Sequence, residues 1–186
     1  YSKFKVLCEK IILDHQDNNF TTTVIRPATV CGYAPRQRMD LTVNILTNHA
    51  INNKRILVFG GDQKRPNINI KDMARVYVKV LESEKSKIAG EIFNAGYENY
   101  TIRKLAEIVR KKIDEKVSID FQSTNDKRSY HISSEKIKEK LGFQNRHDIE
   151  EAVESLKIAF ENKKLKDPLN NPLYFNIQRM KQINLK

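Results

Sequence analysis

The feature that most constrains the fold is a stretch rich in β-branched residues at positions 20–25, which lies between a helical pattern and a proline. Such residues favour strands because their side chains pack well on a pleated, half-buried surface. Ahead of the run, residues 4, 7, 8, 11 and 12 are apolar at helical spacing, which predicts a helix to about residue 15. After it, Pro27 and Gly32 are expected to stop the strand. A helix, a strand and a loop in this order favour a parallel α/β sheet, in which ligands bind beyond the carboxyl ends of the strands.

The rest of the chain continues this alternation, so the predicted fold class is α/β. Strands are predicted at residues 56–59, 67–70, 91–94 and 117–121. Helices are predicted at residues 41–52, 72–81, 101–115, 134–141 and 148–162, with Asp72, Thr101 and Asp148 as N-caps. Residues 163–186 contain two prolines and little periodicity, and we expect an extended or partly disordered tail.

Composition disfavours several classes of protein. Hydrophobic residues make up 39% and charged residues 31%, as is ordinary for a soluble globular protein. No apolar run approaches the ~20 residues that span a bilayer, and no signal peptide is visible, so no membrane partner is expected. The two cysteines and four histidines lack the spacing of a metal site. We therefore expect no metal, and a cytoplasmic location is the default.

The net charge of +11 raises the question of nucleic-acid binding. Acidic residues interleave with the lysines throughout, and no basic stripe with interleaved aromatic residues is present. We interpret the charge as a solvated, lysine-rich surface with a minor share that attracts anionic ligands, and we do not expect a nucleic-acid partner.

The first five residues contain a candidate catalytic pair. On a helix, Tyr1 and Lys5 lie one turn apart on the same face. A phenol with a pKa near ~10 is too weak a base at pH 7, and a neighbouring ammonium favours its ionised form. The pair can therefore serve as a general base for a hydroxyl proton. The same spacing occurs by chance in many helices, as an exposed aromatic beside a solvated lysine.

Three blocks of sequence, in order, carry a family resemblance. They are the pair Tyr1 and Lys5 with Arg26-Pro27 after the next strand, the segment 59–72 with Gly60, Gln63 and Arg65, and Arg128 followed by Leu141-Gly142-Phe143. Together they resemble the extended short-chain dehydrogenase/reductases, specifically the NAD-dependent epimerase/dehydratase family that acts on nucleotide sugars. The likeness covers residues 1–162.

The resemblance implies the C-terminal part of a doubly wound, Rossmann-like parallel sheet with a smaller mixed α/β substrate-binding domain. Residues 1–35 and 67–96 are expected in the second half of the NAD(P)-binding domain, residues 36–66 and 97–162 in the nucleotide-sugar domain, and residues 163–186 in the tail. In this family a Gly-rich fingerprint, its acidic ribose partner and a catalytic Ser or Thr precede the tyrosine, and this sequence contains none of them. We therefore expect a fragment that neither binds NAD nor turns over alone.

The implied activity is epimerisation or dehydration of a nucleotide-diphosphate sugar with NAD or NADP, similar to UDP-glucose 4-epimerase, in a homodimer. By resemblance, Tyr1 is the general base, and Lys5 lowers its pKa and holds the nicotinamide ribose. Pro27, Thr29 and Val30 are expected to line the nicotinamide site. The last three residues can also be explained structurally, as parts of a turn that ends a strand.

Five further residues are expected to bind the substrate. The resemblance places Asn44 near the phosphates, and Val58 and Phe59 at the nucleotide base through their main chain. Arg65 and Arg128 are expected to converge on the diphosphate, since arginine offers a fixed fork of donors. The alternative is a non-catalytic nucleotide- or nucleic-acid-binding module on the same fold, and steep salt dependence of binding would distinguish it.

Overall fold

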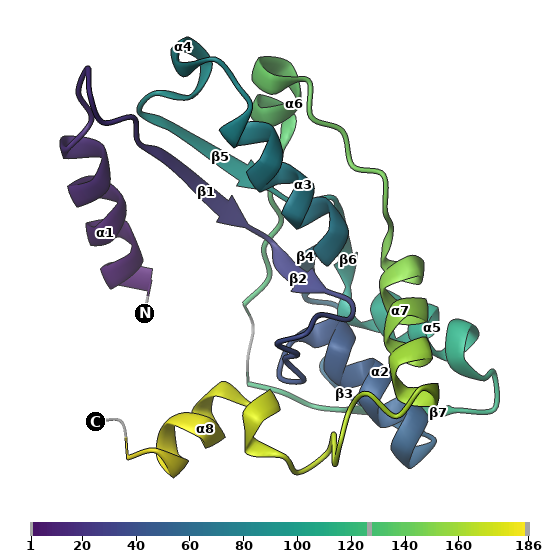
Figure 1. Cartoon of the computed structure of the whole chain (residues 1–186). Helices are drawn as coiled ribbons and strands as arrows, with labels where there is room; N and C mark the ends of the chain where they lie inside the picture. The colour runs from purple at the N-terminus through teal and green to yellow at the C-terminus, as the bar shows by residue number, and fades with distance from the viewer. Residues whose placement is uncertain (1, 126–127, 185–186) are drawn as a thin grey trace.

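Three short sheets built mainly by parallel pairing organise the molecule. β1 (Thr23–Pro27) pairs in parallel with β5 (Glu91–Ala95), and β3 (Arg55–Phe59) pairs in parallel with β7 (Ser118–Gln122). β2 (Thr29–Cys31) pairs in parallel with β4 (Lys64–Asn69), whose other edge pairs antiparallel with β6 (Glu98–Thr101). In this computed structural model, which describes residues 2–125 and 128–184, the three sheets follow one another down the molecule (Figure 1).

The helices confirm most of the sequence pattern. They are α1 (Ser2–Asp14), α2 (Thr42–Asn53), α3 (Ile70–Leu81), α4 (Lys85–Ile88), α5 (Ile102–Ile113), α6 (Glu135–Leu141), α7 (Ile149–Glu161), the 3₁₀ helix η1 (Pro172–Tyr174) and α8 (Asn176–Gln182). The side chains of Thr101 and Asp148 cap α5 and α7 as predicted, by accepting backbone N–H bonds. The α/β fold class is confirmed, although the first strand begins at Thr23 rather than at residue 20.

Two main cores hold these elements. The upper core joins α3, β5 and α6, with Met73, Val76, Phe93, Ile137 and Leu141 among its buried residues. The lower core lies between α2, α5 and α7 and is covered by the sheet of β3 and β7; its members include Val43, Leu46, Leu105, Val109 and Val153. The chain crosses between the two cores along β1 and β2, where a ligand site was expected.

Asp72 does not cap α3, and that prediction was wrong. Asn69 is the N-cap, and its side chain accepts a backbone N–H bond. Asp72 lies in the first turn, fully buried, where its Oδ2 accepts bonds from the backbone N–H groups of Arg146 and His147, both at 2.9 Å. A carboxylate near a helix start fits a cap equally well. Its Oδ1 pairs with Arg75 one turn later, but the two N–H donors to Oδ2 lie 74 and 75 residues later, beyond the reach of local patterns.

The C-terminal segment, residues 163–184, is more ordered than the predicted extended or disordered tail. It forms η1 and α8 and joins a third buried cluster of Met39, Ala159 and Leu165. Helices this short carry too little periodicity to stand out in a sequence, since tertiary contacts supply most of their stability.

Helix α1 stands apart from the rest of the fold (Figure 1). It buries no residue, and its apolar positions, such as Phe4 and Ile11, are exposed. Its contacts with the rest of the fold include an ion pair from Glu9 to Arg26. Just beyond its end, Oε1 of Gln16 accepts bonds from the backbone N–H groups of Thr22 and Gly90.

Candidate functional site

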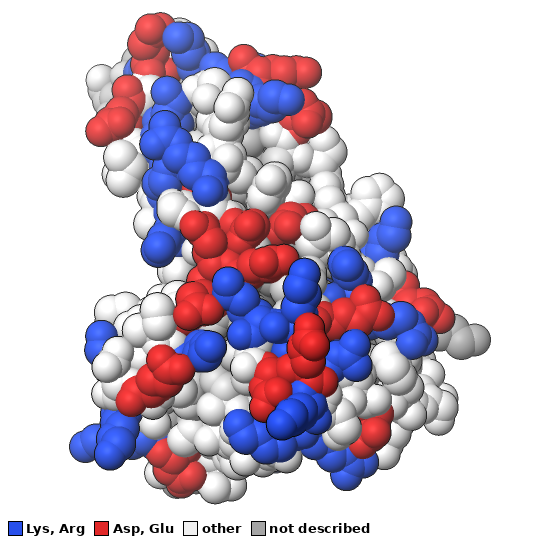
Figure 2. Space-filling model, turned by 90° about the vertical axis from the view of Figure 1, so that its right-hand side faces the viewer, with Lys and Arg blue, Asp and Glu red and all other residues white. Residues whose placement is uncertain are grey.

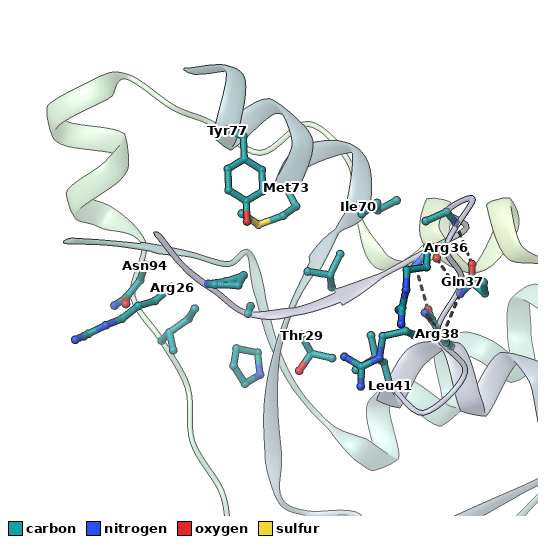
Figure 3. A pocket seen from close by; sticks show the side chains of 18 of the residues that line it. Arg26, Thr29, Arg36, Gln37, Arg38, Leu41, Ile70, Met73, Tyr77 and Asn94 are labelled. Atoms are coloured by element: carbon teal, nitrogen blue, oxygen red, sulfur yellow. Dashed lines mark hydrogen bonds between the residues drawn. The ribbon is translucent and has the colours of Figure 1, made fainter. Parts of the chain in front are cut away.

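A cavity of about 1000 Å³ opens where β1 ends and β2 begins (Figure 3). Its floor is the segment 26–30, one wall is the loop after β2, and α3 contributes Ile70, Met73 and Tyr77. The floor is fixed by the backbone: β1 pairs with β5 as far as Pro27, the N–H of Ala28 bonds to the carbonyl of Ala95 at 2.7 Å, and β2 then joins β4. This position is the carboxyl end of a parallel strand, where α/β folds place ligands.

Three residues predicted for the cofactor line this floor. Pro27, Thr29 and Val30 all border the cavity, at the end of β1 and within β2.

The wall of the cavity is a loop, residues 32–41, which we call the arginine loop because Arg36 and Arg38 both border the cavity. Asn44 braces it from α2: its Oδ1 accepts a bond from the N–H of Gly32 at 3.0 Å, and its Nδ2 donates to the carbonyl of Arg38 at 2.8 Å. Asn44 is buried and borders the cavity itself.

Gln37 and Gly32 complete the wall. The Oε1 of Gln37 accepts a bond from the N–H of Ala34 at 3.0 Å, and its Nε2 donates to the carbonyl of Arg38, also at 3.0 Å. Gly32 has a φ of +108°, and an added Cβ would lie 3.1 Å from Ile70. The sequence-based analysis missed Arg36, Gln37 and Arg38, although two arginines flanking a glutamine near a predicted ligand loop were a usable signal.

The structure brings Arg65 and Arg128 together, but neither borders the cavity. Nη1 of Arg65 donates to the carbonyl of Arg128, and its guanidinium lies 5.5 Å from the centre of the Tyr130 ring. Tyr130 and Pro66, next to these arginines in the chain, do border the cavity. The two predicted diphosphate residues are therefore neighbours, although their sequence separation is 63.

Val58 and Phe59 lie on β3, away from this cavity. Val58 is buried in the lower core, and Phe59 is about half exposed where β3 ends. The carbonyl of Phe59 accepts a bond from Nε2 of Gln63 at 2.8 Å. Contact of their main chain with a nucleotide base remains a prediction.

The predicted catalytic pair is only partly described. Tyr1 lies outside the described residues. Lys5 lies on an exposed position of α1 and does not border the cavity. The link between this helix and the floor is the ion pair in which Nε and Nη2 of Arg26 donate to Glu9 at 2.9 and 2.5 Å.

Electrostatics favour an anionic ligand in the cavity. Arg26, Arg36 and Arg38 border it, and among the described residues no Asp or Glu does. The hydrogen bond from Arg26 lowers the pKa of Glu9, which therefore stays charged at neutral pH. Burial raises the pKa of the Cys31 thiol to about 12, which excludes it as a nucleophile at neutral pH.

Within residues 2–125 and 128–184, no group of three or more His, Cys, Asp or Glu could hold a metal ion. In the same part of the chain, no helix is long and apolar enough to cross a membrane.

The family model of the NAD dependent epimerase/dehydratase family matches residues 1–96, which include the cavity floor, the arginine loop, Asn44 and Arg65. The chain belongs to this family.

Solved structures of the same fold cover most of this chain. Pal from Bacillus thuringiensis is 25% identical over 88% of this chain and 53% of its own, with a TM-score of 0.74. UDP-glucuronic acid 4-epimerase from Bacillus cereus, in complex with UDP-glucuronic acid and NAD, is 23% identical over 78% and 46%, with a TM-score of 0.67. The dTDP-glucose 4,6-dehydratase of Bacillus anthracis, in complex with NAD, is 20% identical over 87% and 52%, with a TM-score of 0.71. The chain thus spans about half the length of these family structures.

Proposed function

We propose that this chain supplies the Tyr/Lys pair and the sugar-binding part of an NAD(P)-dependent nucleotide-sugar epimerase or dehydratase, similar to UDP-glucose 4-epimerase. One observation carries the proposal: within the family match, four residues predicted from the sequence border a single cavity. They are Pro27, Thr29, Val30 and Asn44. Three arginines around the same cavity fit an anionic substrate.

The residues present fit one end of a dinucleotide. Lys5 would hold the nicotinamide ribose, and Pro27, Thr29 and Val30 would lie against the ring. The sequence contains no Gly-rich turn for the pyrophosphate, so this chain by itself offers only part of a cofactor site. A bound nicotinamide would supply a hydride acceptor and donor for a sugar carbon.

Residues of this chain would carry out the proton transfer. The Tyr1 phenolate takes the proton of the sugar hydroxyl as the carbon is oxidised, and the Lys5 ammonium keeps the phenolate form accessible near neutral pH. For an epimerisation this one acid/base group would be enough, whereas a dehydration would need another acid/base pair.

Binding energy comes from the far end of the substrate. Arg65 and Arg128 grip the diphosphate with fork-shaped donors, and Asn44 contributes beside the arginine loop. Val58 and Phe59 meet the base through their main chain. Because the diphosphate is remote from the reacting carbon, these contacts hold the substrate in both ground and transition states.

The same proposal extends to the organisation of the whole enzyme. Residues 1–35 and 67–96 belong to its cofactor domain and residues 36–66 and 97–162 to its sugar domain, in a cytoplasmic homodimer. In this chain the short helix α6 packs into the upper core with α3 and β5, so it serves as a bridge between the two parts.

Calorimetry on the 186-residue chain tests the proposal. Titration with UDP-glucose and dTDP-glucose should show saturable binding of at least one of them, whereas NAD should not bind. Absence of binding for both nucleotide sugars at millimolar concentration, with the chain folded by circular dichroism, would contradict the proposal.

The same experiment addresses nucleic acid, the alternative raised by the net charge. On the face shown in Figure 2, basic and acidic side chains lie side by side and form no continuous basic surface. Affinity for a short duplex that fell steeply with salt and exceeded the affinity for nucleotide sugars would favour the alternative.

A further inference from the structure

The C-terminal segment is hydrogen-bonded to the arginine loop. The N–H of Met39 donates to the carbonyl of Tyr174 at 2.9 Å, and the N–H of Asn176 donates to Oδ2 of Asp40 at 3.0 Å. Met39 is fully buried in the third cluster, where Tyr174 and Phe175 pack against it. The segment that follows α7 therefore contacts a loop more than 130 residues earlier in the chain.

Asp40, which accepts the bond from Asn176, also pairs with the side chain of Arg38. Oδ1 of Asp40 accepts a bond from Nε of Arg38 at 2.9 Å, and Oδ2 accepts one from Nη2 at 3.1 Å. A guanidinium has five N–H donors, so three remain for a ligand in the cavity that Arg38 borders (Figure 3).

The backbone and the side chain of Arg38 are held by different partners. Its carbonyl accepts bonds from Asn44 and Gln37, both independent of the C-terminal segment. The direction of its guanidinium depends on Asp40, and one oxygen of Asp40 is shared with the N–H of Asn176. The carbonyl of Arg38 is therefore held by residues of the loop and of α2, whereas its guanidinium is held by a carboxylate that also contacts the C-terminal segment.

We propose that Asp40 is a positioning residue that aims Arg38 into the cavity, and that residues 172–176 hold Asp40 in place. This inference rests on the proposed function, in which the cavity receives an anionic nucleotide sugar. A long side chain that is already oriented loses less rotamer freedom on binding, so its contact with the ligand contributes more to affinity. The C-terminal segment, beyond the residues matched by the family, is thereby part of the binding site.

Three variants test separately the roles of Arg38, Asp40 and Asn176. Arg38→Gln removes the guanidinium proposed to contact the ligand, Asp40→Asn removes the charge that orients it, and Asn176→Pro removes the backbone N–H that donates to Asp40. Asn176 is the first residue of α8, a position that accepts proline without loss of the helix. Asp167→Asn is the matched control, because Asp167 lies in the same segment and bonds only within it.

Calorimetry with the nucleotide sugar that binds the wild-type chain provides the first readout. We expect Arg38→Gln to weaken binding by roughly tenfold. Asp40→Asn and Asn176→Pro should weaken it by roughly three- to tenfold, and Asp167→Asn should have no effect. The double variant Arg38→Gln/Asp40→Asn should bind like Arg38→Gln alone. If the effects of the two substitutions add, or if Asp40→Asn leaves binding unchanged, Asp40 does not act through Arg38 and the proposal fails.

The second readout needs no ligand, so it separates failure of this inference from failure of the proposed function. In the wild-type chain the Nε–H signal of Arg38 should be protected and resolved by ¹⁵N NMR, since Nε donates to Asp40. In Asn176→Pro it should exchange faster, while the amide spectrum of residues 42–53 stays the same. An unchanged Nε–H signal overturns the inference whether or not the chain binds nucleotide sugars.

Discussion

Helix α1 and the arginine loop both carry residues assigned to the site, but the rest of the molecule holds them in opposite ways. Helix α1 buries no residue, and its contacts include the partly exposed pair of Glu9 and Arg26 and the bonds of Gln16 just beyond its end. The arginine loop has buried residues, such as Met39, and accepts or donates hydrogen bonds to α2, α7 and the C-terminal segment.

This difference separates two tasks of an enzyme. A loop that is fully braced before the ligand arrives is suited to binding, because little entropy is lost when the ligand contacts it. The helix with Lys5 is positioned by a few surface contacts, so its placement is the more easily changed of the two. We therefore expect substitutions on α1 to affect turnover and those around the loop to affect affinity and stability.

The largest effect is expected on turnover, from a substitution of the proposed general base. In the complete enzyme, Tyr1→Phe should lower kcat by roughly 10²–10⁴, the range of general acid–base catalysis, and leave the KM for the nucleotide sugar nearly unchanged. Steady-state kinetics measures both values. Turnover equal to that of the wild type would remove Tyr1 from the mechanism, and a rise in KM alone would place it with the binding residues.

The next largest effect is expected at the diphosphate. Charge-assisted hydrogen bonds contribute ~1.5–3 kcal/mol, so Arg65→Ala or Arg128→Ala should weaken nucleotide-sugar binding by roughly ten- to a hundredfold. Calorimetry on the 186-residue chain measures this, with the exposed Arg110 changed to Ala as a control for lost positive charge.

Lysine at either position separates the fork from the charge. Arg65→Lys and Arg128→Lys keep the charge but lose the paired donors, so they should recover only a small part of the affinity. Full recovery by lysine would mean simple electrostatic attraction, and the bidentate contact would be ruled out.

Local patterns were enough to predict what neighbouring residues determine. The N-caps at Thr101 and Asp148 and most helix and strand positions follow from spacing over a few residues, and the structure confirms them. The role of Asp72 was interpreted wrongly and the helices of the C-terminal segment were not predicted, because both have partners more than 70 residues away in the chain.

The same limit applies to the site. The resemblance named Pro27, Thr29, Val30 and Asn44, and the structure adds that all four border one cavity. The resemblance could not reveal that Asp40 orients Arg38, since that arrangement depends on the backbone N–H of a residue in the C-terminal segment. A backbone donor is present at nearly every position, so the sequence cannot identify which one is used.

An intermediate effect on stability is expected at the brace of the arginine loop. Asn44→Ala leaves the N–H of Gly32 buried without its acceptor, which should lower the free energy of unfolding by about 1–3 kcal/mol. Chemical denaturation measures this loss. Asn53→Ala, at the exposed end of the same helix, is the control and should change stability by less than about 0.5 kcal/mol. Equal losses in the two variants would mean that α2, rather than the loop, responds to the substitution.

The smallest effect is expected at the attachment of α1. An exposed ion pair contributes ~0–1 kcal/mol, so Glu9→Gln should leave global unfolding nearly unchanged but speed hydrogen exchange of the α1 amides.

The hydrogen bond from Arg26 lowers the pKa of Glu9 below its usual 4.5. The contribution of the pair is therefore complete above pH 4.5 and is lost as the pH falls through the lowered pKa. In the wild type, exchange in α1, corrected for the intrinsic pH dependence, should accelerate over that interval, whereas in Glu9→Gln it should stay fast and constant. Asp14→Asn, on the same helix, should behave like the wild type. If Glu9→Gln left exchange in α1 as slow as in the wild type, the pair would not hold the helix, and other contacts would have to account for its position.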